Sequence, residues 1–111
     1  MFSAWGMLTF MYNGAPLLFQ LPAARYYDGA TVVADFNALI NAYFVADGEP
    51  GAIDWLSFVD NSFEFENKGA HDVTALVIYG PLRYLMGYEG IPVAQVIAPG
   101  NAVQFGTNTP F

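Results

Sequence analysis

The sequence predicts an α+β fold: a mainly antiparallel sheet packed by one amphipathic helix (about residues 32–46) and one short helix (about residues 81–87). Two observations predict this class. Runs of aromatic and aliphatic residues of strand length alternate with turn residues, and one long run carries apolar residues at helical spacing. Because the chain has 111 residues, we expect a single domain, residues 1–111, around one core.

A β-hairpin is predicted at the N-terminus, over residues 1–22. Residues 4–12 and 15–21 are rich in aromatic and aliphatic side chains, and Asn13-Gly14 between them suits a type I′ turn. Pro16 is expected at a sheet edge, because it cannot donate a ladder hydrogen bond. The apolar N-terminus lacks the basic residues of a signal peptide, so we interpret it as a strand.

The longer helix is predicted from its cap and its apolar spacing. Thr31 is the expected N-cap, with Asp35 in the early turns, where the helix dipole favours an anion. Asp47 and Gly48 are expected to end the helix. Apolar residues recur along it at Val32, Phe36, Leu39, Ile40 and Tyr43.

The rest of the chain is predicted to be mostly strand. Residues 53–59, 63–66 and 73–79 have strand character. Glu64 and Glu66 alternate with phenylalanines, which indicates a solvent-facing edge.

The C-terminal third is predicted to hold the second helix, a hairpin and an arm. Gly80-Pro81 is a helix start, and the short helix depends on packing for its stability. Residues 91–98 and 102–105 suggest a last hairpin, and residues 106–111 an extended C-terminal arm.

The chain is poor in charge. Charged residues make up 12% and hydrophobic residues 55% of the sequence, against about 25% charged in a typical domain. We therefore favour an apolar face covered by a partner over an unusually large core. The net charge of −7 argues against direct nucleic-acid binding and against anionic membranes. No run reaches the ~20 apolar residues of a transmembrane segment.

No enzymatic motif is visible in the sequence. The absence of cysteine excludes disulfides, thiol catalysis and thiolate metal sites. His71, the one histidine, stands beside Asp72 and is interpreted as a surface loop residue. The acid pairs Glu64 with Glu66, Asp47 with Glu49, and Asp54 with Asp60 are interpreted as solvated. We predict no catalytic residue, no metal site and no cofactor.

Five segments follow one another over about residues 17–88. They are a strand ending Phe19-Gln20-Leu21-Pro22, a connector Tyr26-Tyr27-Asp28-Gly29, a helix with Asn37-Ala38-Leu39-Ile40-Asn41-Ala42, Phe63-Glu64-Phe65-Glu66, and Leu85-Met86-Gly87-Tyr88. This order resembles a module of minor capsid and penton-associated proteins of tailless icosahedral viruses and virus-like transposons. The connector order differs from that module, Met86 and Tyr88 stand where it more usually has Leu and Phe, and both chain ends lie outside the match. The resemblance implies that the segments serve packing.

The resemblance implies a non-enzymatic virion structural protein: a minor capsid, vertex-associated or cement protein located in the virion. Its expected partners are other virion proteins or copies of itself, and its terminal arm is expected to add a strand to a neighbour's sheet edge. The expected interface contributors are the exposed members of Phe2, Trp5, Phe10, Tyr26, Tyr27, Tyr88, Phe105 and Phe111.

Two other functions remain open from the sequence. One is a small binding domain of a phage tail or receptor-binding apparatus, recognising carbohydrate or an apolar ligand. It requires that several of Trp5, Trp55, Tyr26 and Tyr84 converge in a concave pocket. The other is an acid-dependent hydrolase, which requires two carboxylates facing one cleft and one of them with a raised pKa.

Overall fold

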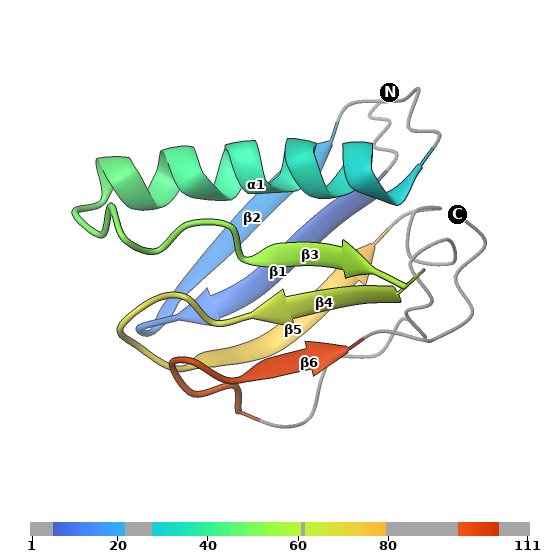
Figure 1. Cartoon of the computed structure of the whole chain (residues 1–111). Helices are drawn as coiled ribbons and strands as arrows, with labels where there is room; N and C mark the ends of the chain where they lie inside the picture. Colours follow the sequence, from blue (N-terminus) through green and yellow to red (C-terminus); the bar gives the residue numbers. More distant parts are fainter. Residues whose placement is uncertain (1–5, 22–27, 61, 80–95, 105–111) are drawn as a thin grey trace.

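The computed structural model describes residues 6–21, 28–60, 62–79 and 96–104 (Figure 1). These residues form two three-stranded antiparallel sheets and one helix, which confirms the α+β prediction. Sheet A has the order β2-β1-β5 and sheet B the order β3-β4-β6. The elements are β1 Gly6–Tyr12, β2 Ala15–Leu21, α1 Gly29–Ala46, β3 Leu56–Val59, β4 Ser62–Glu66, β5 Val73–Tyr79 and β6 Ala102–Gln104.

The N-terminal hairpin forms as predicted. Tyr12 pairs with Ala15, and the two residues between them have positive φ angles of 50° at Asn13 and 79° at Gly14. Positive φ at both central positions is the signature of a type I′ turn. Pro16 lies on β2, which is an edge strand, so its missing N–H costs no hydrogen bond within the sheet.

Strand β5 pairs with the other side of β1 and contains an irregularity. The register shifts between Thr9 and Met11 of β1, where Ala75 of β5 has a φ of 53°. One extra residue on β5 is therefore accommodated as a β-bulge, which leaves Leu76 and Ile78 directed into the core.

Helix α1 starts earlier than predicted. The Asp28 side chain accepts a hydrogen bond from the backbone N–H of Thr31 at 2.7 Å, so Asp28 is the N-cap and the prediction of Thr31 is wrong. Asp is at least as good an N-cap residue as Thr, and the extended backbone of Asp28 lets its carboxylate reach the first turn of the helix. The predicted end is confirmed, because the helix ends at Ala46 with Asp47 as its C-cap. The second predicted helix, residues 81–87, lies outside the described residues.

Sheet B corrects two predictions. The extended run begins at Leu56 instead of residue 53, because Asp54 has a φ of 60°, which lies outside the β region. Glu64 and Glu66 do face outward, but β4 is the central strand of the sheet and not an edge, since β6 pairs with its far side.

The predicted last hairpin does not form in the part of it that the structure describes. Ile97 bridges to Val73 of sheet A, whereas β6 pairs with β4 of sheet B. The turn between them exists, with the N–H of Asn101 donating to the carbonyl of Ala98 at 2.9 Å. Residues 97–104 therefore join the two sheets. The arm over residues 106–111 lies outside the described residues.

The core lies between the two sheets, with α1 running along one side next to β2 and β3 (Figure 1). Trp55 is at its centre, stacked on Phe44 of α1 at 4.8 Å and on Phe10 of β1 at 5.5 Å between ring centroids. Its indole N–H donates to the carbonyl of Ala52 at 2.9 Å. Burying such a ring contributes roughly 3 kcal/mol.

Helix α1 is also long and apolar enough to cross a membrane, with a mean hydropathy of 1.3 over 18 residues. The buried helix of a globular core has the same composition. In this fold Val32, Phe36, Ile40 and Phe44 are fully buried against the sheets. Their packing accounts for part of the hydropathy of α1, whereas Leu39 and Val45 are 40% and 57% exposed.

Candidate functional site

One end of the molecule gathers three loops around a tyrosine hydroxyl. Tyr12, the last residue of β1, donates to the Glu49 carboxylate at 2.7 Å to Oε1 and 2.9 Å to Oε2. The same hydroxyl accepts the backbone N–H of Ala70 at 2.8 Å and of His71 at 3.3 Å. Glu49 Oε1 also accepts the Ala70 N–H at 3.1 Å. A single hydroxyl thus connects the hairpin to the loop before β3 and to the loop after β4.

The chemistry of this junction is structural. Burial, reinforced by the hydrogen bond to Glu49, raises the pKa of Tyr12 above its ordinary value. The hydroxyl therefore stays protonated, and its ring is 4% exposed, which leaves it out of reach of a substrate. His71 lies edge-on to the ring of Tyr12 at 5.5 Å and is exposed, as its prediction as a surface loop residue requires.

Two shallow hollows flank this junction, with volumes of about 370 and 400 Å³. Asn13, His71 and Asp72 line the first, and Glu49 and Lys68 the second. No Phe, Tyr or Trp lines either hollow, and both are open to solvent. A small-molecule site normally encloses most of its ligand and presents apolar or aromatic walls, so neither hollow favours a ligand-binding function.

The acid pairs do not form a hydrolase site in the described residues. Asp54 is exposed and its carboxylate accepts from the side-chain amide of Asn41 at 3.1 Å. Glu66 faces outward and forms an ion pair with Lys68 at 3.4 Å. No described hollow is lined by two carboxylates. Within the described residues no group of three or more His, Asp or Glu is placed to hold a metal.

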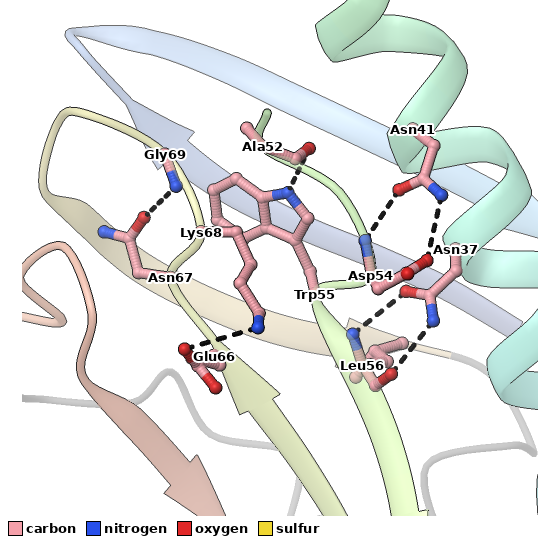
Figure 2. A network of polar contacts seen from close by, with 10 residues as sticks. All are labelled: Asn37, Asn41, Ala52, Asp54, Trp55, Leu56, Glu66, Asn67, Lys68 and Gly69. Atoms are coloured by element: carbon pink, nitrogen blue, oxygen red, sulfur yellow. Dashed lines mark hydrogen bonds and ion pairs between the residues drawn. The ribbon is translucent and has the colours of Figure 1, made fainter. Parts of the chain in front are cut away.

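Two asparagines of α1 bind the backbone at and just before the start of β3 (Figure 2). Asn37 accepts the N–H of Leu56 and donates to its carbonyl, both at 2.9 Å. One turn along the helix, Asn41 accepts the N–H of Asp54, which precedes β3, at 2.9 Å. The Asn37 amide therefore takes the place of a neighbouring strand at the first residue of this free edge.

Asn67 holds the opposite corner of sheet B together. Its side chain is 1% exposed, donates to the carbonyls of His71 and Ile97 at 2.8 Å each, and accepts the N–H of Gly69 at 2.9 Å. Its backbone exchanges hydrogen bonds with the 97–101 turn. Sequence reasoning treated Asn67 as a loop residue. The signal it offered was slight, because Asn is common in loops.

The predicted interface residues are placed as follows. Phe10 is 2% exposed and packs against Trp55 and Phe65 in the core, so its prediction as a contact residue is wrong. Its position on the inward face of β1 follows from the strand alternation. The other members lie outside the described residues: Phe2, Trp5, Tyr26, Tyr27, Tyr88, Phe105 and Phe111. Trp55, required by the ligand-binding alternative, is 1% exposed and is likewise a core residue.

The outer face of sheet A is the candidate contact surface. None of the 21 residues of β1, β2 and β5 is charged. The strand alternation and pairing direct three residues of each strand outward. Leu18 is 59% and Tyr79 48% exposed there. We define this as the uncharged face: Met7, Thr9, Met11, Pro16, Leu18, Gln20, Thr74, Val77 and Tyr79, of which Val77 belongs by its pairing but is only 7% exposed. The sequence shows that these three segments contain no charge, but it does not show that they lie side by side in one sheet.

The charges of the described residues lie elsewhere. Glu64 and Glu66 face outward on β4 of sheet B. The remaining acids sit on α1, at its caps or in loops, at Asp28, Asp35, Asp47, Glu49, Asp54, Asp60 and Asp72. The two outer faces of the sandwich thus differ: one is acidic and the other carries no charge.

Comparison with known proteins gives no relative. No protein-family model, no curated protein and no solved structure matches this chain. The resemblance to a capsid module therefore stays a prediction, and a function has to be argued from the surfaces of the molecule.

Proposed function

We propose that this chain is a non-enzymatic structural component of a virus particle, a minor capsid, vertex-associated or cement protein that acts by packing against other subunits. The observation that carries the proposal is the uncharged face of sheet A. An acidic chain that keeps an entire outer sheet face free of charge fits a subunit with that face covered by protein.

The junction at Tyr12 and the pairing of Asn37 with β3 support the same function. Both stiffen the sandwich with hydrogen bonds, and the Tyr12 and Asn37 side chains that make these bonds are buried. Rigid surfaces lose little entropy when subunits pack together. Two observations count against the ligand-binding alternative: Trp55 is buried, and no Phe, Tyr or Trp lines the hollows beside Tyr12. A third hollow, of about 310 Å³, has Tyr79 in its wall, but it lies on the uncharged face and is open to solvent.

Fractionation of the source culture tests the proposal. Particles are separated from free protein on a density gradient after nuclease and protease treatment, and an antibody raised against this chain is used to probe each fraction. We expect the chain to sediment with particles at a constant ratio to the major shell protein through repeated gradients. Finding it only among free proteins would overturn the virion role.

A further inference from the structure

We propose that the uncharged face of sheet A is a contact between two copies of this chain, packed face to face about a two-fold axis. The inference rests on the proposed function and names the partner for that surface. Face-to-face packing of sheets is an arrangement that sandwich proteins already use in their cores, and a two-fold axis makes the same patch serve both copies.

The absence of charge makes this face a surface on which a second copy can pack. Two chains of net charge −7 repel each other, and on the other described elements acids outnumber the single lysine, Lys68, which is already paired with Glu66. The uncharged face is where two copies meet without bringing acid against acid. A basic partner would instead be attracted to the outer face of sheet B, where Glu64 and Glu66 lie.

The shape of the face also allows two copies to fit together, because a hollow lies beside a protruding side chain. A shallow hollow of about 310 Å³ lies over the middle of β1, lined by Thr9, Met11, Pro16, Val77 and Tyr79 among others. Leu18, directly opposite Thr9 on β2, stands out beside it. A two-fold axis running between β1 and β2 in the plane of contact places each Leu18 over the other copy's hollow.

Two of the four sheet edges are poorly suited to the addition of a strand from another copy. At the free edge of β3, the side-chain amide of Asn37 already occupies the N–H and the carbonyl of Leu56. The free edge of β2 contains Pro16, which has no N–H to donate to an added strand. Strand addition is therefore obstructed at these two edges.

The size of the face predicts a weak contact. Three strands of seven residues cover roughly 14 by 24 Å, or about 340 Å² per copy. A stable dimer buries about 800 Å² per partner. We therefore expect association between micromolar and millimolar concentration, strengthened in a particle by the other contacts of each subunit.

Sedimentation equilibrium of the full chain, from micromolar to millimolar concentration, tests the contact. Leu18→Glu and Val59→Glu form a matched pair, because each places one acid at a site of similar exposure, 59% and 65%, but Val59 ends β3 outside the uncharged face. We expect a monomer–dimer equilibrium whose Kd rises at least about tenfold in Leu18→Glu and changes less than about twofold in Val59→Glu. Circular dichroism confirms that both fold.

Charge rescue identifies the two-fold arrangement. Leu18→Glu and Leu18→Lys should each dimerise poorly alone, and an equal mixture should associate more tightly than either. Equal effects of Leu18→Glu and Val59→Glu, or no rescue in the mixture, would overturn the contact. A chain that stays monomeric alone but sediments with particles would also overturn it, and the virion role would survive. A Leu18-dependent dimer absent from particles would refute the virion role alone.

Discussion

Asn37 and Leu56 exchange two hydrogen bonds of 2.9 Å, so that one side-chain amide pairs with a strand backbone as a neighbouring strand would. Asn37 is 8% exposed and Leu56 2% exposed. A buried polar group without a partner costs far more than a hydrogen bond gains. The pair therefore fixes both the position of α1 and the register of β3 beneath it.

Replacing Asn37 tests this relationship. Asn37→Leu leaves the N–H and the carbonyl of Leu56 buried and unpaired, and we expect the free energy of unfolding to fall by about 2–4 kcal/mol. Asn41→Leu is the matched control, because its partners at Asp54 are exposed and water replaces them, with an expected loss below about 1 kcal/mol. Urea denaturation measures both. Equal losses would show that Asn37 is no more than a solvated helix residue.

The Tyr12 hydroxyl is expected to make stability fall at high pH. Because burial and then Glu49 raise the pKa of Tyr12 in the folded chain, the neutral phenol is favoured by folding. This contribution is complete below the unfolded pKa of about 10 and is lost as the pH rises through the folded value.

Comparison with Tyr12→Phe isolates that contribution from the other tyrosines. We expect Tyr12→Phe to cost about 1–3 kcal/mol at neutral pH, because Ala70 and Glu49 lose their shared partner. The gap between the two proteins should then narrow above about pH 10. Tyr43→Phe is the control for the loss at neutral pH, since no described residue hydrogen-bonds to the Tyr43 hydroxyl, and we expect it to cost less there. Its own raised pKa comes from burial and then the nearby charges of Asp47 and Glu49. A gap that stays constant with pH would contradict the assignment.

Gly69 is expected to tolerate no side chain. A Cβ there would overlap the Tyr12 hydroxyl and come within 2.8 Å of its ring carbons. Tyr12 cannot move aside easily, because its hydroxyl is hydrogen-bonded to Glu49, Ala70 and His71. Gly69→Ala should therefore lower the free energy of unfolding by about 1–3 kcal/mol. Gly51→Ala, with no atom within 4 Å of its added Cβ, should be neutral or stabilising by up to about 1 kcal/mol. Thermal unfolding distinguishes the two, and similar melting temperatures would refute the close approach.

The Asp28 carboxylate is expected to make the stability of the folded chain fall at low pH. The hydrogen bond from the Thr31 N–H lowers the pKa of the Asp28 carboxyl, so its stabilisation is present above the unfolded pKa of about 4 and is lost as the pH falls through the lower folded value. Asp28→Ala should lower Tm at neutral pH and match the wild type in strong acid. A difference in Tm that persists in strong acid would show that the carboxylate charge is not its cause.

Much of this fold is local and follows from the sequence. Asn13 and Gly14 adopt positive φ readily, so the first hairpin and its register are predictable. The helix between Asp28 and Asp47 and the alternation of Phe63 and Phe65 with glutamates are likewise encoded by neighbouring residues. The N-cap was misplaced by three residues because Thr31 and Asp28 are equivalent in type, and only the extended backbone at Asp28 decides between them.

The partners of each strand were decided only by the tertiary structure. Ile97 and Val103 look like two sides of one hairpin, yet Ile97 bridges to β5 and Val103 pairs with β4. Ile97 is buried in the core and Val103 packs against it half-buried, so both lie against the same core from different sheets' backbones. By itself the sequence determined that the chain is acidic, poor in charge and of α+β class. Packing decided that Phe10 and Trp55 are core residues, and that the three charge-free strands lie side by side in one sheet. Strand pairing depends on contacts between residues far apart in the chain, which local sequence patterns do not encode.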